Sequence, residues 1–296
     1  IYINMGIIKD SLTFDDVTLI PDYSSVLPSE TNTLTQISSR LNLKIPLLSS
    51  AMDTVTESKM AIAISKAGGI GVIHRNLSIQ KQISEVKKVK KSNCIVGAAI
   101  GVNNADIERA YELNKAKVDL IIIDTAHGHT KKVLEMIKKV KNNIKNTTLC
   151  AGNIATGKAA KFLGDSGVDI VKVGIGPGSI CTTRLVAGIG VPQLSAIIEV
   201  KKALKRHKTK IISDGGIKFS GDLAKAIAAG ADAIMIGSLF SGTSESPGKI
   251  LKKNGKLYKN FRGMGSVGAM SVGSSDRYYQ KRFKDISKYV PEGVKE

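Results

Sequence analysis

Short apolar runs alternate with amphipathic segments along most of the chain. Eight runs have the length and composition of buried strands, at residues 47–52, 69–74, 95–100, 120–126, 148–154, 170–175, 210–217 and 233–240. Apolar residues recur at helical spacing in seven intervening segments, at 58–67, 79–91, 106–117, 130–142, 157–166, 192–207 and 220–229. This alternation predicts an α/β fold of the TIM (β/α)8 barrel type, with a doubly wound open sheet as the structural alternative. We expect one barrel domain over residues 1–296.

The last part of the chain departs from this alternation. Residues 250–261 surround Asn254-Gly255, a dipeptide that predicts a hairpin turn and therefore a projecting finger. Residues 266–288, called the flap below, are rich in Gly, Ser and charged residues and offer few apolar anchors, so we expect a mobile segment. No segment long enough to be the eighth barrel helix follows, and we expect that helix to be missing from this sequence.

Composition narrows the function classes. No run of 18 or more apolar residues and no signal-peptide pattern occurs in the sequence, so neither a membrane span nor secretion is expected. The three cysteines are sparse and odd in number, which favours a reducing cytoplasm over a disulfide framework. The net charge of +19 comes largely from lysines at helical spacing, as on solvated outer faces, and aromatic residues make up only 4% of the chain. Nucleic acid binding should be at most weak and non-specific.

Candidate chemistry is concentrated in residues 174–184, Gly-Ile-Gly-Pro-Gly-Ser-Ile-Cys-Thr-Thr-Arg. The glycines and the proline exclude regular structure and let the backbone approach a ligand closely. The hydroxyls of Ser179 and Thr183 and the cation of Arg184 suit an anionic ligand, while Cys181 suits covalent chemistry. The alternative interpretation is a tight loop that carries an inert cysteine.

This loop resembles the catalytic loop of the family that contains inosine-5′-monophosphate (IMP) dehydrogenase and guanosine-monophosphate (GMP) reductase. The resemblance extends from about residue 12 to residue 293. Four further motifs carry it: Leu48-Ser-Ser-Ala-Met-Asp-Thr-Val-Thr-Glu57, Asp124-Thr-Ala-His-Gly-His129, Ser213-Asp-Gly-Gly-Ile217 and Arg262-Gly-Met-Gly-Ser266.

The resemblance implies NAD-dependent oxidation of IMP to xanthosine monophosphate (XMP), the committed step of guanine nucleotide biosynthesis. Cys181 would add to purine C2, a hydride would leave for NAD, and water would release the product. The alternatives are an NADPH-dependent GMP reductase and a non-catalytic barrel that binds nucleotides or nucleic acid. The sequences Asp276-Arg277-Tyr278 and Glu292-Gly293 favour the dehydrogenase over the reductase.

The resemblance also implies the site residues. The catalytic set is Cys181, Thr183, Arg277 and Tyr278. The substrate set is Ser50, Met52, Asn153, Lys172, Ser179, Asp214, Gly216, Gly237, Ser238, Met264, Gly265 and Glu292. Asp124, His127 and Gly174 would bind the cofactor, and the carbonyls of Gly176, Gly178 and Cys181 would bind a potassium ion.

Two details of the implied site need a special arrangement. Arg277 as a base would require a deprotonating network, because a free guanidinium stays protonated at neutral pH. Phe261 stands where the family commonly has a tyrosine, so we expect a weaker grip on phosphate or compensation from Tyr258.

The resemblance has consequences for domain organisation and assembly. The family usually inserts a module of paired cystathionine-β-synthase-type repeats after the second barrel helix. Here Lys91-Ser92-Asn93-Cys94 joins helix to strand directly, so the module is expected to be absent, by deletion or by nature. In the family, residues of a neighbouring subunit complete the potassium and cofactor sites, so the resemblance implies a homotetramer.

Overall fold

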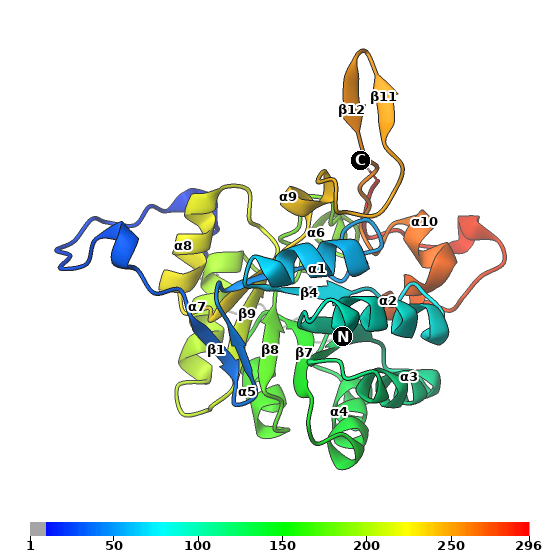
Figure 1. Cartoon of the computed structure of the whole chain (residues 1–296), viewed down its shortest axis with the longest axis horizontal. Helices are drawn as coiled ribbons and strands as arrows, with labels where there is room; N and C mark the ends of the chain where they lie inside the picture. Colours follow the sequence, from blue (N-terminus) through cyan, green and yellow to red (C-terminus); the bar gives the residue numbers. More distant parts are fainter. Residues whose placement is uncertain (1–9, 296) are drawn as a thin grey trace.

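The computed structural model describes residues 10–295, and its centre is a closed parallel barrel (Figure 1). The barrel order is β10-β3-β4-β5-β6-β7-β8-β9, and every neighbouring pair is parallel. The strands are β3 (Leu47–Ser49), β4 (Ile70–Ile73), β5 (Val96–Ile100), β6 (Leu120–Asp124), β7 (Thr148–Ile154), β8 (Ile170–Val173), β9 (Lys210–Asp214) and β10 (Ala233–Ile236). The predicted TIM barrel is confirmed.

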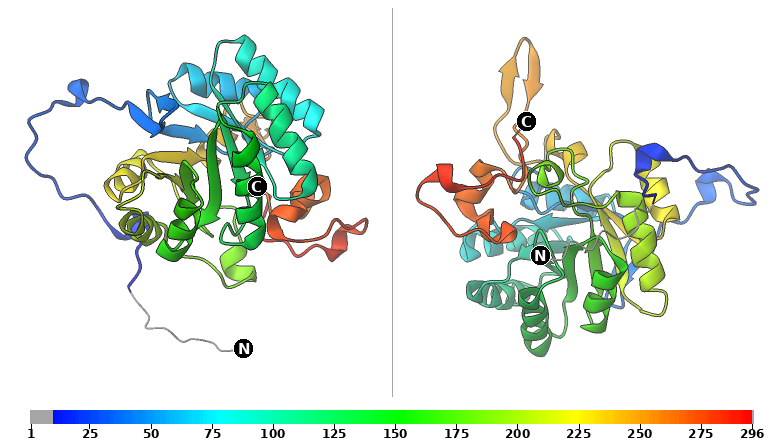
Figure 2. Two further views of the ribbon diagram at one scale, coloured as in Figure 1. Left: turned by 90° about the horizontal axis from the view of Figure 1, so that it is seen from below. Right: turned by 180° about the vertical axis from the view of Figure 1, so that it is seen from behind.

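Amphipathic helices surround this barrel (Figure 2). They are α1 (Ser58–Lys66), α2 (Ile79–Lys91), α3 (Asn104–Lys115), α4 (Lys131–Asn143), α5 (Gly157–Asp165), α7 (Gln193–Ala203) and α8 (Ser220–Ala228). Ser78, Thr130 and Thr156 cap three of them by accepting a hydrogen bond from a backbone N–H in the first turn. Within residues 10–295, β10 is followed by the single turn α9 (Ser238–Ser241), a short hairpin and helical turns of at most five residues, and none of these is long enough to be the eighth barrel helix.

A hairpin that the sequence did not predict closes the amino-terminal end of the barrel. Its strands are β1 (Thr35–Ser38) and β2 (Leu41–Leu43), paired antiparallel. Ile37 and Leu43 are fully buried in the same apolar cluster as the inward-facing side chains of the barrel strands. A hydrogen bond of 2.7 Å between the Ser38 and Thr148 hydroxyls ties the hairpin to the start of β7. The carboxyl ends of the strands are therefore the open end, where TIM barrels place their chemistry.

The carboxyl-terminal finger and the flap both follow β10. The finger consists of β11 (Leu251–Lys253) and β12 (Lys256–Tyr258), and Asn254 and Gly255 both have positive φ, as its tight turn requires. The flap contains α10 (Val267–Ala269), the distorted helical turns Met270–Ser274 and Ser275–Tyr278, and the turn Ile286–Lys288. Ala269 and Met270 are fully buried, so the flap has firmer apolar anchors than its composition suggested. Its mobility stays a prediction.

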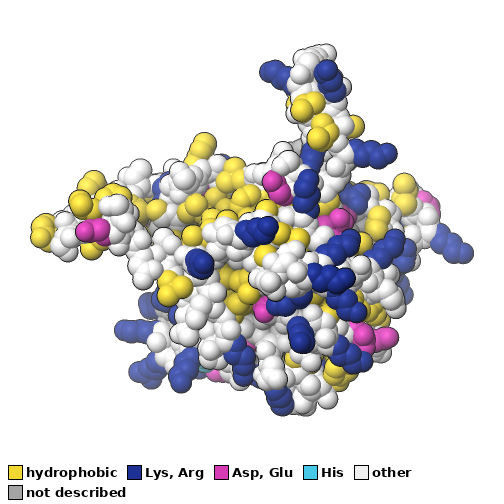
Figure 3. All heavy atoms as spheres, in the orientation of Figure 1, with side chains coloured by type: hydrophobic (Ala, Val, Ile, Leu, Met, Phe, Trp, Pro, Cys, Tyr) yellow, Lys and Arg dark blue, Asp and Glu magenta, His cyan; other side chains and the backbone are white. Residues whose placement is uncertain are grey.

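Residues 92–95 connect α2 directly to β5, and no domain stands between them. Lysine and arginine side chains are spread over the outer surface in Figure 3 and do not form one continuous patch on that face. Of the helices between residues 10 and 295, none combines the length and apolar character needed to cross a membrane.

Candidate active site

A pocket of about 200 Å³ opens at the carboxyl ends of the barrel strands. It is lined by side chains that follow or end several strands, from the catalytic loop at 174–184 and from the flap. Most of the predicted site residues line it: Ser50, Met52, Asp124, Asn153, Lys172, Gly174, Gly176, Gly178, Ser179, Cys181, Thr183, Asp214, Gly216, Gly237, Ser238, Met264, Arg277, Tyr278 and Glu292. His127 and Gly265 are the two that do not.

Cys181 lies in a chain of three polar side chains. Its Sγ donates to Thr183 Oγ1 at 3.2 Å, and the Thr183 hydroxyl donates to Glu292 Oε2 at 2.8 Å. The backbone holds this arrangement, because Thr182 N donates to Glu292 O at 2.9 Å and Cys181 forms a β-bridge with Gly293. Glu292 and the catalytic loop, far apart in sequence, therefore form one unit.

The other two cysteines have different surroundings. Cys94 and Cys150 are buried, whereas Cys181 is partly exposed to the pocket. Burial raises the pKa of the Cys150 thiol far above its ordinary value. Because the thiolate is the nucleophile, Cys181 is the cysteine of the three that is suited to react.

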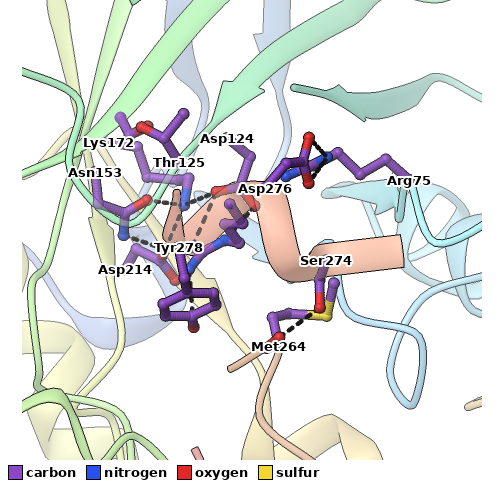
Figure 4. Close-up of polar contacts among 12 residues, drawn as sticks. Arg75, Asp124, Thr125, Asn153, Lys172, Asp214, Met264, Ser274, Asp276 and Tyr278 are labelled. Carbon is purple, nitrogen blue, oxygen red and sulfur yellow. Dashed lines mark hydrogen bonds and ion pairs between the residues drawn. The ribbon is translucent and has the colours of Figure 1, made fainter. Parts of the chain in front are cut away.

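Four charged side chains meet in the pocket, and two of them, Lys172 and Asp124, are buried. Lys172 Nζ lies 3.0 Å from Asp124 Oδ1, 2.5 Å from Asp214 Oδ2 and 2.5 Å from Asn153 Oδ1 (Figure 4). Burial lowers the pKa of Lys172, but the two carboxylates outweigh burial and raise it above its ordinary value. Asn153 Nδ2 also donates to Asp214 Oδ2 at 2.9 Å. Lys172 is therefore the fixed cation that holds both carboxylates in place.

Arg277 is the fourth charge, and the flap brings it to Asp124. Its Nε donates to Asp124 Oδ2 at 2.7 Å, its Nη2 donates to Asp124 Oδ1 at 3.1 Å, and its Nη1 donates to the Tyr278 hydroxyl at 3.2 Å. Burial lowers the pKa of Arg277, but the charge of Asp124 outweighs burial and holds that pKa well above its ordinary value. This arrangement keeps the guanidinium charged, so the role of Arg277 as a base, which would require a deprotonating network, stays a prediction.

The same contacts set the protonation of its two neighbours. Burial raises the pKa of Asp124, but Arg277 and Lys172 outweigh it, so the pKa lies far below the ordinary value and the carboxylate stays ionised. Burial raises the pKa of Tyr278, whose phenol therefore stays neutral at pH 7.

The end of the pocket nearest β9 and β10 is formed by small residues. Gly215 and Gly216 have φ of 93° and 83°, a left-handed turn that glycine adopts without strain and that leaves backbone N–H groups accessible.

Phe261 is buried beside Ile180 and lines the pocket. Tyr258 lies in the finger with 51% of its surface exposed and does not line the pocket, so it does not compensate for the missing hydroxyl.

His127 and Gly265 contact the flap instead of lining the pocket. The His127 side chain is exposed, and its carbonyl oxygen accepts a hydrogen bond of 2.7 Å from the Tyr279 hydroxyl. The Gly265 carbonyl accepts from Glu292 N at 3.0 Å, and a side chain at this glycine would meet the Tyr278 ring. The Met264 carbonyl, expected to face a purine, accepts from the Ser274 hydroxyl at 2.5 Å.

The sequence interpretation missed the ion pairs that connect these motifs. Arg262 Nη2 donates to Asp53 Oδ2 at 2.6 Å, and Asn76 Nδ2 donates to the same oxygen at 2.9 Å. Arg75 Nη1 donates to both carboxylate oxygens of Asp276, at 2.8 and 2.9 Å. Both pairs join residues about two hundred positions apart. The only sequence signal for the Asp53–Arg262 pair was that each residue lies inside one of the family motifs.

Comparison with known proteins fits this geometry. Residues 11–296 match the family described as "IMP dehydrogenase / GMP reductase domain". The chain belongs to this family. It is similar to the inosine-5′-monophosphate dehydrogenase of Borreliella burgdorferi, with 48% identity over 338 residues that cover 97% of this chain and 84% of that protein. The protein of the same name from Cryptosporidium parvum is 44% identical over 97% of this chain and 82% of its own length.

A third relative in the IMP dehydrogenase / GMP reductase family bears on domain organisation. The inosine-5′-monophosphate dehydrogenase of Aquifex aeolicus is 38% identical, over 97% of this chain and 84% of its own length. That alignment extends over 416 residues, more than the 296 residues of this chain, so the Aquifex protein has residues without a counterpart here. The absence of an inserted module stays a prediction.

Proposed function

We propose that this protein is an IMP dehydrogenase, which oxidises IMP to XMP with NAD in the committed step of guanine nucleotide biosynthesis. The observation that carries the proposal is the hydrogen-bonded chain from Cys181 through Thr183 to Glu292, in a pocket that also holds Arg277 and Tyr278. A nucleophile, a hydroxyl and a carboxylate at these distances suit formation and hydrolysis of a covalent intermediate. The similar proteins named inosine-5′-monophosphate dehydrogenase support the same reaction.

The substrate would lie along the pocket from β10 to the catalytic loop. Its phosphate would bind at Ser179, Gly216, Gly237 and Ser238, where amides and hydroxyls are available. Asp214 would accept hydrogen bonds from the ribose hydroxyls. The base would pack against Met52, with Ser50, Asn153 and Met264 also lining the pocket. This orientation directs purine C2 toward Cys181.

In the first step the Cys181 thiolate would form a bond to C2, and the hydrogen at C2 would leave with its electron pair. NAD, when bound, supplies the acceptor for this hydride. Asp124 and Gly174 line the pocket where its nicotinamide ribose would bind, and the ionised Asp124 carboxylate suits ribose hydroxyls. The purine would then be held on Cys181 as a thioimidate.

In the second step water would attack C2 and release XMP from Cys181. Because the docked Arg277 stays charged, Thr183 and Glu292 form the better pair to take a proton from water. The Thr183 hydroxyl already donates to Glu292 Oε2 at 2.8 Å, so a proton accepted by Thr183 can pass to the carboxylate. Arg277 and Tyr278 would orient the water and exclude others from the pocket.

The docked flap and the cofactor would compete for Asp124. Both Arg277 hydrogen bonds to Asp124 use the oxygens that ribose hydroxyls would need. The flap must therefore move away for hydride transfer and return for hydrolysis, which is a gating motion.

A potassium ion would bind to the carbonyls of Gly176, Gly178 and Cys181. Carbonyl oxygens suit a potassium ion, and a hydrogen bond of 3.1 Å from Cys181 N to Gly178 O folds these residues into one compact turn. The ion would stabilise the catalytic loop around the nucleophile.

The functional form would be a cytoplasmic homotetramer. Large apolar side chains are exposed on α6 (Thr183–Val186) and α9, with Leu185 at 85% exposure. In Figure 3, hydrophobic side chains gather between the finger and the projecting segment that carries the turn Pro28–Glu30. Surface of this kind suits burial against further copies. The three unpaired cysteines suit a reducing compartment.

Product analysis with two substrate pairs tests the proposal. With IMP and NAD we expect XMP and NADH in equal amounts, and with GMP and NADPH we expect no reaction. Formation of IMP and ammonia from GMP and NADPH would identify a GMP reductase instead. Inactivity with both pairs, together with steeply salt-dependent binding of DNA, would identify a non-catalytic barrel.

A further inference from the structure

The turn that carries Arg277 and Tyr278 is fixed to the barrel on both sides. We propose that Asp276 and Tyr279, which flank the two catalytic residues, form a latch that holds the flap closed over the pocket. Asp276 contacts the side of the barrel near β4 and β5, and Tyr279 contacts the loop after β6. The part of this proposal that concerns catalysis rests on the proposed function, and the structural part does not.

Asp276 supplies the carboxylate for a buried arginine. Arg75 follows β4 and is 7% exposed, and its Nη1 donates to both oxygens of Asp276 (Figure 4). Asn103 Nδ2 donates to Asp276 Oδ2 at 2.6 Å from the start of α3. The Nε and Nη2 of Arg75 have no hydrogen-bond partner within residues 10–295. Opening the flap would remove the carboxylate from this poorly satisfied cation, which favours the closed position.

The Tyr279 hydroxyl connects the other side of this turn to the loop after β6. It donates to His127 O at 2.7 Å and lies 3.3 Å from Thr130 Oγ1. Its backbone has φ of 57°, a left-handed conformation that is unfavourable for a residue with a side chain. Tyr279 N donates to Asp276 O at 3.1 Å, so the two latch residues close one turn and stabilise each other's position.

Between the latch residues, the barrel backbone contacts the flap directly. Ala126 N donates to Arg277 O at 2.9 Å. This amide belongs to the loop after β6 and not to the flap. Its hydrogen bond breaks when the flap leaves, so hydrogen exchange at Ala126 reports flap opening without any substrate.

The test compares hydrogen exchange at the Ala126 amide in the full chain, in three single variants and in one double variant. Asp276→Asn keeps the shape of the side chain and removes its charge, and Tyr279→Phe removes only the hydroxyl. Asp285→Asn is the matched control, because Asp285 also lies in the flap but its carboxylate accepts hydrogen bonds from Ser287, within its own turn, and not from the barrel. Mass spectrometry with fragmentation that resolves single amides measures the rates.

We expect Ala126 to exchange about tenfold faster in Asp276→Asn, equivalent to about 1.4 kcal/mol, and about threefold faster in Tyr279→Phe. Asp285→Asn should match the parent. Adding Asn103→Ala to Asp276→Asn should change the Ala126 exchange rate little further, because Asn103 acts through the Asp276 carboxylate. Unchanged exchange in both latch variants, or equal acceleration in Asp285→Asn, would overturn the latch. If Asp276→Asn unfolds, the Ala126 exchange rate in Tyr279→Phe alone decides whether the latch exists.

A kinetic measurement then separates the latch from the proposed function. With IMP and NAD, Asp276→Asn should keep its initial burst of NADH and lose about tenfold in the steady rate, because only hydrolysis needs the closed flap. A burst and a steady rate that fall together would overturn the positioning role. If the parent protein does not react with IMP at all, the proposed function fails, and the exchange result still decides whether the latch exists.

Discussion

Arg277 depends on a partner that lies far away in the sequence. It pairs with Asp124 through two hydrogen bonds, and this pairing keeps it charged. Its identity as a catalytic candidate came from the family resemblance alone, since the sequence around it reads as an exposed polar segment. Its charge state could not be predicted, because it depends on a carboxylate more than 150 positions earlier in the chain.

Replacing Arg277 by Ala should spare hydride transfer and slow release of the covalent intermediate. The nucleophile and the cofactor side of the pocket are unchanged, whereas the water loses its orienting group. We expect a burst of NADH followed by a steady rate lowered by about 10²-fold. Stopped-flow absorbance at 340 nm measures both phases. Arg282→Ala, an exposed arginine of the same flap, is the control. Loss of the burst together with IMP binding would show that Arg277 belongs to the substrate pocket.

Asp53 carries a pH-dependent part of the stability. Burial raises its pKa, but hydrogen bonds from Arg262 and Asn76 outweigh burial and lower it below the ordinary value. A carboxyl with a lowered folded-state pKa contributes stability above its unfolded pKa of about 3.9, and this contribution is lost as pH falls through the folded value.

Asp53→Asn should therefore destabilise the protein at pH 7 by about 3 kcal/mol, because it leaves Arg262 without its carboxylate. The difference from the parent should shrink below about pH 4. Urea unfolding across this pH range measures it. A difference that is independent of pH would show that the charge of Asp53 does not stabilise the fold.

At the scale of elements, the sequence predicted the repeated strands and helices of the barrel. It missed the β1–β2 hairpin and the docked position of the flap, each of which occurs once. The barrel strands were found because they are short, continuously apolar runs, and the seven long helices were found because apolar residues recur along one face of each. The β1–β2 hairpin was missed because polar residues interrupt its apolar positions and because it occurs once, outside the repeated pairs of apolar strand and amphipathic helix. The docked position of the flap was missed because its contacts, such as Asp276 with Arg75, are long-range.

Leu43→Ala should destabilise the barrel by about 2–5 kcal/mol. Leu43 is fully buried where the hairpin closes the barrel, so the substitution leaves a cavity in the inner core. Urea unfolding measures the change, and Leu34→Ala is the matched control because Leu34 is 61% exposed. Equal effects of the two substitutions would mean that the hairpin does not contribute to the core.

At the scale of the whole molecule, the barrel brings the family motifs to one end. Motifs at 48–57, 124–129, 213–217 and 262–266 are dispersed in sequence, yet residues of all four line one pocket. The barrel topology made this convergence predictable, since each motif follows a strand or the finger. The proposed homotetramer rests on the family resemblance and not on the hydrophobic pattern, because exposed apolar residues look the same in sequence as buried ones.

Sedimentation velocity should show a homotetramer at assay concentrations. The exposed apolar side chains of α6 and α9 lie beside the catalytic loop, so assembly would cover them and steady that loop. Leu185→Asp should weaken the assembly and lower activity together, because burying a charge there is unfavourable. A fully active monomer would refute the proposed assembly.

The proposed reaction requires Cys181 to hold the purine while the hydride leaves. Quenching the protein with acid during turnover of IMP and NAD, and mapping the modified peptide by mass spectrometry, tests this step. We expect a purine nucleotide attached to Cys181 that requires both IMP and NAD, with Cys94 and Cys150 unmodified and with neither adduct nor NADH in Cys181→Ser. NADH formation by Cys181→Ser, or turnover of the parent without an adduct on Cys181, would contradict it.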